Sequence, residues 1–255
     1  MMLSLSEMQD FYNDLAPHYH LLFDDWDAGM GRQGRQLSAL IGERWPGASS
    51  ILDVSCGIGT QAIALAANGY RVTASDLSAK AVERATLEAR KRSLDISFSE
   101  CDMLEAHSHH GGGFDVVISC DNALPHLLTD ESILAALKQI FACARPGGGC
   151  LFTIRDYDKE QRGKNIFKPY GVRVEGDNRY AILQTWDFEG DIYDLTLYIV
   201  KEDLESKQVT AEAMHARYYA ISAAKMMRLM EQAGFEQVKR VEANFQTAML
   251  GTVPI

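Results

Sequence analysis

The chain lacks the features that mark several large classes of protein. Its 255 residues contain no run of eighteen apolar residues, so no membrane-spanning helix is expected. Residues 1–10 show no basic segment followed by an apolar one, and we therefore expect no secretory signal peptide and a cytoplasmic location. The five cysteines include no Cys-x-x-Cys pair, which predicts reduced thiols that are mostly buried.

Positive charge is also scarce. Lys and Arg number 25 against 35 Asp and Glu, which gives a formal net charge of −10. Basic residues stand together only in short pairs, such as Lys91-Arg92 and Lys239-Arg240. Because nucleic-acid binding needs clustered positive charge, this balance argues against a nucleic-acid partner. The hydrophobic content of 47% predicts an ordinary globular chain with a substantial core.

One segment, residues 107–113, is rich in histidine and glycine. His107, His109 and His110 are followed by three glycines. Three imidazoles are potential metal ligands, but no cysteine or acidic residue stands at a ligand spacing beside them. We therefore expect an exposed loop here and no metal site.

Strands and helices alternate in the first part of the chain. Two N-terminal helices are expected at residues 6–16 and 28–45. Short apolar strands at 51–54, 71–75, 95–100, 114–119 and 150–154 then alternate with helices at 60–68, 78–92 and 130–144. Apolar strands that alternate with helices predict a doubly wound α/β fold, with a parallel sheet covered on both faces.

The pattern changes after residue 158. Extended segments at 173–175, 180–188, 192–201 and 209–219, with a turn at 189–191, predict an inserted antiparallel meander. A helix at 222–232 and strands at 235–241 and 245–253 then resume the first pattern. We therefore expect three parts: N-terminal helices and a cofactor-binding core (1–158), an inserted antiparallel sheet that covers the substrate or forms an assembly surface (159–216), and the completion of the core sheet (217–255).

A glycine loop joins the first core strand to its helix. Its sequence, residues 52–60, is Leu-Asp-Val-Ser-Cys-Gly-Ile-Gly-Thr, and glycines let the backbone approach a ligand at the helix N-terminus. Asp76, 19 residues after Gly57, ends the next strand, where a carboxylate can accept both hydroxyls of a ribose. These features suit a nicotinamide dinucleotide as well as S-adenosylmethionine. Asp53 favours the latter, because an acid at this strand end repels a pyrophosphate and attracts a cation.

Together these motifs resemble the class I S-adenosylmethionine-dependent methyltransferases over nearly the whole chain. In that family the Leu-Asp-Val-x-Cys-Gly-x-Gly-Thr loop cradles the methionine end of the cofactor, and Pro-Gly-Gly, here at residues 146–148, leads into the fifth strand. The resemblance implies a Rossmann-like sheet of seven strands with the last antiparallel, and S-adenosylmethionine as the cofactor. It implies cofactor contacts from Tyr12, Trp26, Arg32, Asp53, Ser55, Gly57, Gly59, Asp76, Leu77, Asp102, Met103 and Ser119, with Arg35 as an alternative to Arg32.

The ends of the fourth and fifth strands bear on the methyl acceptor. The Asn/Asp-Pro-Pro-Tyr motif of enzymes that methylate base or glutamine amides is absent after the fourth strand. Arg155 follows the fifth strand, and its planar guanidinium suits a carboxylate. A salt bridge with Asp156 or Asp158 is the alternative explanation of this arginine.

A narrower resemblance is carried by four further segments. They are Asn122 with His126-Leu127, Arg155-x-Tyr157-Asp158, residues 163–166 (Gly-Lys-Asn-Ile) and Tyr218-Tyr219. They look like the glycine and glycine/sarcosine N-methyltransferases. The resemblance implies that Arg155 binds an amino-acid carboxylate and that Asn122 positions the substrate, with Tyr19, His126, Tyr218 and Tyr219 completing the catalytic set. Because Tyr218 and Tyr219 alternate across a strand, only one of them is expected to face the pocket.

The sequence therefore predicts an enzyme that moves a methyl group from S-adenosylmethionine to the amino nitrogen of glycine, sarcosine or both. Two alternatives remain: a methyltransferase for another small amine or acid, and a cofactor-binding regulatory module without turnover. The expected partner is a small amino acid, with no nucleic acid, membrane or metal. The number of subunits, the proton acceptor and the physiological role, betaine synthesis or cofactor homeostasis, stay open.

Overall fold

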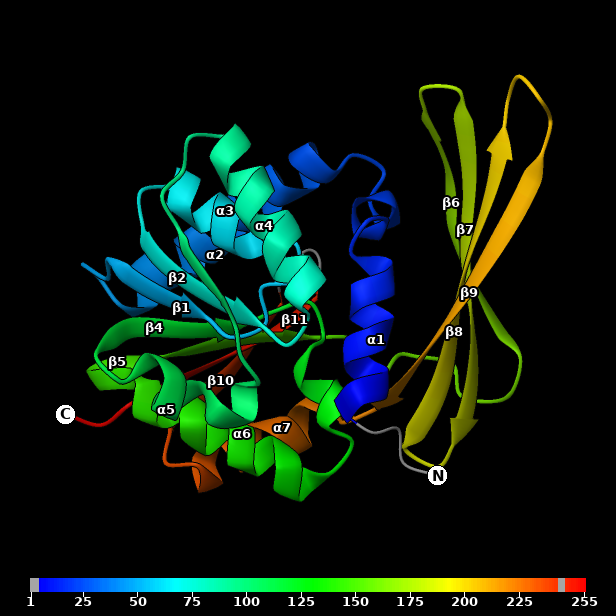
Figure 1. The fold of residues 1–255 in the computed structure, drawn as a ribbon. Helices are drawn as coiled ribbons and strands as arrows, with labels where there is room; N and C mark the ends of the chain where they lie inside the picture. The colour runs from blue at the N-terminus through cyan, green and yellow to red at the C-terminus, as the bar shows by residue number, and fades with distance from the viewer. Residues whose placement is uncertain (1–4, 243–245) are drawn as a thin grey trace.

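Two β-sheets stand side by side, and helix α1 (Leu5–Leu15) lies between them (Figure 1). The computed structural model describes residues 5–242 and 246–255. Within these ranges, no helix is long and apolar enough to cross a membrane. All five cysteines are free and buried, as predicted.

The larger sheet has seven strands in the order β10-β11-β5-β4-β1-β2-β3. Strands β1 to β5 run parallel, and β11 runs antiparallel to both of its neighbours, β5 and β10. This confirms the predicted fold class, although Phe245, the first residue of the predicted last strand, lies outside the described residues. The strands are β1 (Ser50–Asp53), β2 (Arg71–Asp76), β3 (Ser97–Glu100), β4 (Phe114–Ser119), β5 (Ala144–Ile154), β10 (Glu236–Glu242) and β11 (Thr247–Thr252).

Helices cover both faces of this sheet (Figure 1). One face carries α2 (Trp26–Arg44), α3 (Thr60–Ala67) and α4 (Ala79–Lys91), and the other carries α5 (Ala106–His110), α6 (Asp130–Cys143) and α7 (Ala223–Gln232). The starts of α4, α6 and α7 are fixed by side-chain caps, since the hydroxyls of Ser78, Thr129 and Ser222 accept backbone N–H bonds. Apolar side chains from both layers of helices are buried against the strands, and each contributes about 1.5–3 kcal/mol.

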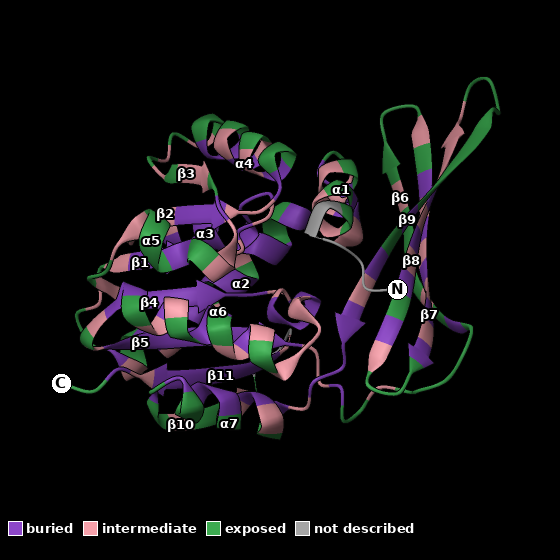
Figure 2. Cartoon of the chain, turned by 60° about the horizontal axis from the view of Figure 1, so that its bottom comes forward, coloured by how far each residue is buried: buried purple, intermediate pink, exposed green. Residues whose placement is uncertain are grey.

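The smaller sheet is the predicted antiparallel meander. It comprises β6 (Ile166–Glu175), β7 (Asn178–Glu189), β8 (Ile192–Asp203) and β9 (Val209–Tyr219), paired in chain order. Burial alternates along β7 and β8, as the banded colours in Figure 2 show, so one face is buried. Trp186, Tyr193 and Leu197 on that face pack in one cluster with Phe11 and Leu15 of α1.

Strand β5 begins earlier than predicted, at Ala144 instead of residue 150. The Pro-Gly-Gly-Gly segment, which reads as a helix end, is therefore part of the strand. A methyl group added at Gly149 would lie 2.2 Å from the carbonyl oxygen of Gly251 and 2.5 Å from the ring of Trp45. Glycine at this position allows β11 and Trp45 to approach the strand closely.

The histidine-rich segment is also ordered differently from the prediction. His107 to His110 belong to the short helix α5, and only residues 111–113 form the connection to β4. Ala106 is fully buried in the cluster that includes α6. The backbone N–H of His107 donates to Gln139 Oε1 of α6 at 3.1 Å, which holds the segment as a helix.

We expect Gly149→Ala to destabilise the fold by about 1–3 kcal/mol, because the added methyl group meets backbone that cannot move aside. Gly42→Ala is the control: no atom lies within 4 Å of its added methyl group, so this helix-interior change should stabilise by about 0.5–1 kcal/mol. Urea unfolding of both variants measures the difference. Equal stability of Gly149→Ala and the unaltered chain would show that β5 and β11 are not packed as described.

Candidate functional site

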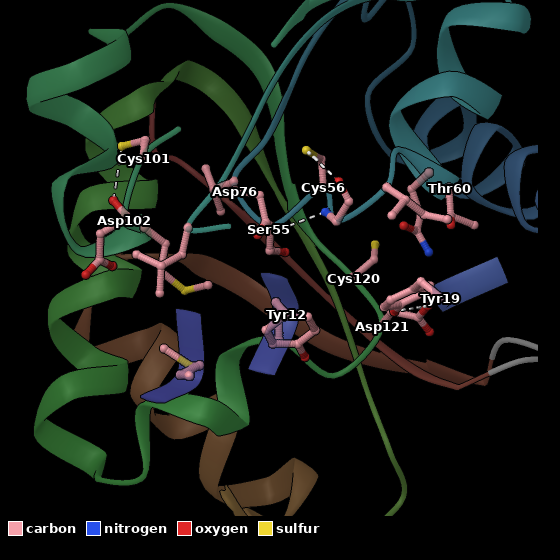
Figure 3. Close-up of a pocket in the computed structure, with 18 of the residues that line it drawn as sticks. Tyr12, Tyr19, Ser55, Cys56, Thr60, Asp76, Cys101, Asp102, Cys120 and Asp121 are labelled. Carbon is pink, nitrogen blue, oxygen red and sulfur yellow. Dashed lines mark hydrogen bonds between the residues drawn. The ribbon is translucent and has the colours of Figure 1, made fainter. Parts of the chain in front are cut away.

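A cavity opens at the carboxyl ends of the parallel strands, where the reacting groups of a doubly wound sheet are found (Figure 3). Helix α1 and the short helix η1 (Tyr19–Leu22) cover it with Tyr12 and Tyr19. In Figure 3, Asp102 lies at one end of the cavity, and Asp121 lies beside Tyr19 at the other. The loops after the strands supply the floor: Ser55, Cys56, Gly57 and Ile58 after β1, Asp76 and Leu77 at β2, Cys101, Asp102 and Met103 after β3, and Cys120 and Asp121 after β4.

The glycine loop presents its backbone to this cavity. Gly57 has a φ of +52°, and a methyl group added there would meet no atom within 4 Å. Gly59, at φ +94°, is the N-cap of α3, and a methyl group there would lie 2.8 Å from Ile63 Cδ1. The loop therefore leaves room for a ligand at Gly57, and Gly59 allows the close approach of the helix.

Asp76 ties the glycine loop to the end of β2. Its Oδ2 accepts the N–H of Gly57 at 2.8 Å, and its Oδ1 accepts the N–H of Ser78 at 2.9 Å. Burial raises the pKa of Asp76, and these N–H groups oppose the rise. Each carboxylate oxygen keeps a second lone pair, so Asp76 can still accept two hydroxyl groups from a ligand in the cavity.

Asp53 is completely buried behind Ser55. Its Oδ1 accepts the N–H of Ser55 at 3.1 Å, whereas Oδ2 has no hydrogen-bond partner among the described residues. Burial raises the pKa of Asp53 to about 7, and the charges of Asp76 and Asp121 add to the effect. An unpaired buried carboxylate oxygen costs free energy, which a cationic group placed in the cavity would offset.

A second cavity adjoins the first, and the two share Tyr12, Tyr19 and Asp121. Its walls come from both sheets. The larger sheet supplies Asp121, Asn122 and Arg155, and the smaller sheet supplies Tyr170, Gln184, Leu195, Leu197 and Tyr218. The shared residues mark the place where a group in one cavity can reach a group in the other.

Arg155 is held by aromatic residues of the smaller sheet. Its Nη1 donates to the hydroxyl of Tyr193 at 3.1 Å, and its guanidinium carbon lies 4.4 Å from the centre of the Trp186 ring. Its Nε is 3.7 Å from Glu160 Oε1. Asp156, which the sequence offered as a salt-bridge partner, pairs instead with Lys159 at 2.8 Å and Arg240 at 2.9 Å.

Asn122 positions the neighbours of Arg155. With Asp121 at φ +60° and Asn122 at φ +71°, two left-handed residues follow β4, a conformation that Asp and Asn adopt more readily than other side chains. The Asn122 Oδ1 accepts the backbone N–H of Arg155 at 3.0 Å, and its Nδ2 donates to the Tyr157 hydroxyl at 2.8 Å. Asn122 therefore lines the second cavity and also fixes the backbone of Arg155 and the side chain of Tyr157.

Tyr12, His126 and Tyr218 form a hydrogen-bonded group at the junction of the cavities. His126 Nδ1 is 3.2 Å from the carbonyl oxygen of Arg217, and a carbonyl only accepts, so Nδ1 carries the proton. His126 Nε2 then accepts from the Tyr12 hydroxyl at 2.6 Å, and the Tyr218 hydroxyl lies 3.4 Å from that of Tyr12. Burial lowers the pKa of His126 to about 3, so its ring is neutral at physiological pH.

Some predicted site residues lie elsewhere. Tyr219 faces the opposite side of β9 from Tyr218, and its hydroxyl contacts Asp130 Oδ1 at 2.7 Å and Lys225 Nζ at 2.6 Å. Tyr219 lines neither cavity, because alternation along the strand turns it away from the side on which Tyr218 lies. Arg32 and its alternative Arg35 are exposed on α2 and do not line the cavity.

Three further predicted contacts support the cavity from behind. Trp26 Nε1 donates to Thr60 Oγ1 at 2.9 Å, and Ser119 Oγ is 2.8 Å from Ser55 Oγ. Gly59 shapes the turn. Of the predicted cofactor contacts, those that line the cavity directly are Tyr12, Ser55, Gly57, Asp76, Leu77, Asp102 and Met103.

Sequence reasoning missed Asp121, which lines both cavities. The signal was present, because Asp121 is the second residue after the fourth strand and precedes Asn122. Its Oδ1 accepts from Gln246 Nε2 at 3.1 Å, and burial raises its pKa against the opposing effects of Gln61, Arg155 and Tyr19. Tyr193 and Trp186 were also missed, since alternation alone does not tell which face of an inserted sheet meets the core.

The fold and the paired cavities identify a class of protein: enzymes that bind S-adenosylmethionine on a doubly wound sheet and transfer its methyl group. Comparison with known proteins agrees. Residues 51–148 match a family model described as a methyltransferase domain. A putative methyltransferase of Bacillus subtilis, YqeM, is 34% identical over 244 residues, which cover 92% of this chain and 87% of that protein.

Other relatives carry more specific names. A glycine/sarcosine N-methyltransferase of Parasynechococcus marenigrum is 26% identical over 233 residues, covering 90% of this chain and 77% of that protein. A glycine N-methyltransferase of Rattus norvegicus is 33% identical over 141 residues, and the match spans 49% of this chain and only 48% of that relative.

Solved structures share the fold. Streptomyces venezuelae DesVI superposes with a TM-score of 0.77 at 21% identity, covering 89% of this chain and 92% of that one. An amino pentose methyltransferase from Micromonospora echinaspora with bound S-adenosylmethionine gives 0.75 at 18% identity, covering 88% and 91%. The chain belongs to the class I S-adenosylmethionine-dependent methyltransferases, and S-adenosylmethionine is its cofactor. The free space at Gly57 and the orphaned Asp53 oxygen fit a cofactor that carries a sulfonium and an ammonium.

We expect Asp53→Asn to stabilise the cofactor-free protein at pH 8. Because the pKa of folded Asp53 is raised to about 7, its ionisation opposes folding, and stability is lost as pH rises from about 4 to about 7. The variant escapes this loss, which amounts to at most about 4 kcal/mol. Urea unfolding at pH 8 and pH 5 measures the gain, which should shrink at the lower pH.

The same variant should bind S-adenosylmethionine at least about tenfold more weakly, by calorimetry, because a negative charge directly behind the Ser55 wall of the cavity is lost. Asp203→Asn is the control of opposite sign: the N–H groups of Ser206 and Glu205 lower the pKa of Asp203, so its loss should destabilise at pH 8 and leave cofactor binding unchanged. A gain in stability that is the same at both pH values would contradict the assigned ionisation of Asp53.

Proposed function

We propose that the enzyme methylates the amino nitrogen of a small amino acid, with glycine, sarcosine or both as substrates. The observation that carries this proposal is the pairing of opposite charges in one cavity, Arg155 on one wall and Asp121 on another. An amino acid is a zwitterion, so a guanidinium and a carboxylate complement its two ends. Asp121 also lines the cofactor cavity, which puts the amino end of such a substrate nearest the methyl donor.

Arg155 is available to a substrate carboxylate. Among the described residues, only the Tyr193 hydroxyl accepts a hydrogen bond from the guanidinium, which has five N–H donors. Its nearest acid, Glu160, is itself paired with Lys168 at 2.5 Å. The Trp186 ring and the Asn122 amide fix the side chain and backbone of Arg155, so little freedom is lost when a carboxylate binds.

The names of relatives support the same substrate class without establishing it. Two of the relatives described above are named for glycine or for glycine and sarcosine. The solved structures that share the fold include a methyltransferase for an amino pentose, and they bear on the fold alone at 18–21% identity. Methylation of another small amine or acid is therefore the alternative that the substrate panel below separates.

The chain's own residues account for substrate orientation and proton removal. When bound, the cofactor supplies a methyl group on a positively charged sulfur. Arg155 and Asp121 hold the amino acid so that its nitrogen lies at the junction of the cavities, near Tyr12 and Tyr19. Orientation of this kind accounts for about 7–11 kcal/mol in favourable cases, and a direct displacement needs no covalent help from the protein.

Tyr12 and His126 form a path for the proton. The nitrogen must lose a proton before its lone pair can form the new bond to carbon while the carbon–sulfur bond breaks. The Tyr12 hydroxyl donates to the neutral His126 Nε2, so its oxygen lone pair can accept the amine proton as its own proton passes to the imidazole. Because burial lowers the pKa of His126 to about 3, the imidazole is a weak base, and the Tyr12–His126 pair relays the proton without storing it.

We expect Arg155→Met to raise the KM for glycine at least about 100-fold, because a charge-assisted bidentate pair is lost, while the affinity for S-adenosylmethionine changes less than about threefold. Arg162→Met is the matched control, since Arg162 pairs with Asp191 at the surface. Transfer of labelled methyl groups to glycine, sarcosine, dimethylglycine and other small amines measures the effect. Transfer only to substrates without a carboxylate would refute the proposal, and cofactor binding without any transfer would favour a regulatory module.

We expect Tyr12→Phe to lower kcat by about 10²-fold with a smaller change in KM, because the proton path is broken. Tyr219→Phe is the matched control, since this tyrosine faces away from both cavities. Steady-state kinetics at pH 7 and pH 9 distinguish a role in proton transfer from a structural role. More of the amine is already neutral at pH 9, so the loss of a group that only removes the proton lowers kcat less at pH 9 than at pH 7. A Tyr12→Phe enzyme with unchanged kcat at both pH values would exclude Tyr12 from proton transfer.

A further inference from the structure

The fold places a cysteine next to His109 and His110, although no cysteine stands near these histidines in the sequence. Cys101, just after β3, meets His109 and His110 at the end of α5. One potential ligand atom from each of the three side chains lies within 4.8 Å of the others. Cys101 precedes the two histidines by eight and nine positions, and the turn through η2 (Met103–Glu105) and α5 makes them neighbours.

The spacing is close to that of a metal centre. In a tetrahedral zinc site with Zn–S of about 2.3 Å and Zn–N of about 2.0–2.1 Å, the ligand atoms lie about 3.3–3.8 Å apart. The 4.8 Å limit on the separations in the cluster exceeds this range by about 1–1.5 Å, so small side-chain movements are enough to bring the ligand atoms to that geometry. His109 is exposed to solvent, whereas Cys101 is only 7% exposed and fixes the inner side of the cluster.

Two serine hydroxyls orient the imidazoles. His109 Nε2 is 2.9 Å from Ser99 Oγ of β3, and His110 Nε2 is 2.9 Å from Ser75 Oγ of β2. Among the described residues, neither Nδ1 atom has a hydrogen-bond partner, so each ring keeps one nitrogen for another ligand. A polar group on the second ring nitrogen is the usual way in which a metal-bound histidine is held in place.

We propose that Cys101, His109 and His110 form a binding site for a zinc-type transition metal ion, with water completing the coordination on the exposed side of His109. A thiolate and two imidazoles select such an ion over magnesium or calcium, which take oxygen ligands. The Cys101 thiol now donates to the Asp102 carbonyl oxygen at 3.2 Å, and the metal displaces that proton.

The site lies directly behind the cofactor cavity but is distinct from it. Cys101 contributes to the wall of that cavity, and its backbone N–H donates to the Asp76 carbonyl oxygen at 3.0 Å. The two histidines do not line the cavity. The metal site therefore does not depend on which amine the enzyme methylates, and its failure would leave the proposed function untouched.

Cobalt(II) added to the metal-free, full-length protein tests the proposal, because a cobalt–thiolate bond gives an intense charge-transfer absorption. We expect one equivalent of cobalt to bind with this band and zinc to displace it. His109→Ala should weaken cobalt binding about tenfold or more, and Cys101→Ser should abolish the band. His107→Ala is the matched control, since His107 lies on the same helix outside the cluster.

Each contrary outcome overturns the site. A charge-transfer band that survives in Cys101→Ser would place the metal on another cysteine, and equal weakening by His107→Ala and His109→Ala would indicate surface binding to any histidine. Because His109 is exposed, His109→Ala should fold normally even if Cys101→Ser does not, and unchanged methyl transfer in metal-free buffer verifies this. Unchanged cobalt affinity in folded His109→Ala would refute the proposal on its own.

Discussion

The crowding of carboxylates at one edge of the parallel sheet is the constraint on which the site depends. Asp53 and Asp76 end β1 and β2, Asp121 lies two residues after β4, and burial raises the pKa of all three. Coulomb repulsion among them adds to the cost, since Asp76 and Asp121 both raise the pKa of Asp53. Such a cluster is tolerable only where backbone N–H groups or a cation offset it. The glycine loop supplies the N–H groups, and a cationic cofactor supplies the charge.

The second cavity, which is the proposed site of the methyl acceptor, depends on the contact between the two sheets. Arg155 belongs to the larger sheet, whereas Tyr193 and Trp186, which hold its guanidinium, belong to the smaller one. Neither sheet alone forms the proposed carboxylate site. Substitutions on the inner face of β7 and β8 would therefore change the second cavity without disturbing the glycine loop. Proteins that share this fold are named for different substrates, such as glycine with sarcosine and an amino pentose.

Local sequence patterns predicted that the glycine loop and Asp76 lie together, because the residues that carry the chemistry stand at the ends of neighbouring strands. Gly57 and Asp76 follow consecutive strands, so their spacing alone indicates that they meet. The alternation of Tyr218 and Tyr219 predicted that only one would face the pocket, but not which. The partners of Arg155 and the cysteine beside His109 lie beyond such patterns, since both depend on how separate elements pack. The early start of β5 was missed because glycine and proline usually end an element, whereas here they allow Trp45 and β11 to pack closely.

Helix α1 is attached to the two sheets by different kinds of interaction. Its apolar side chains Phe11 and Leu15 are buried in the cluster of the smaller sheet. Its hydrogen bonds to the larger sheet run from Gln9 Nε2 to the Leu77 carbonyl oxygen at 3.0 Å and from Ser78 Oγ to Asn13 Oδ1 at 2.7 Å, and the Tyr12 hydroxyl also lies 3.4 Å from that of Tyr218 in the smaller sheet. Water can replace the hydrogen bonds at little cost, but it cannot replace the burial of the apolar side chains. The helix that covers the cofactor cavity is therefore attached to the smaller sheet by buried apolar surface and to the larger sheet partly by hydrogen bonds that water can replace, so its contact with the smaller sheet is the more permanent of the two.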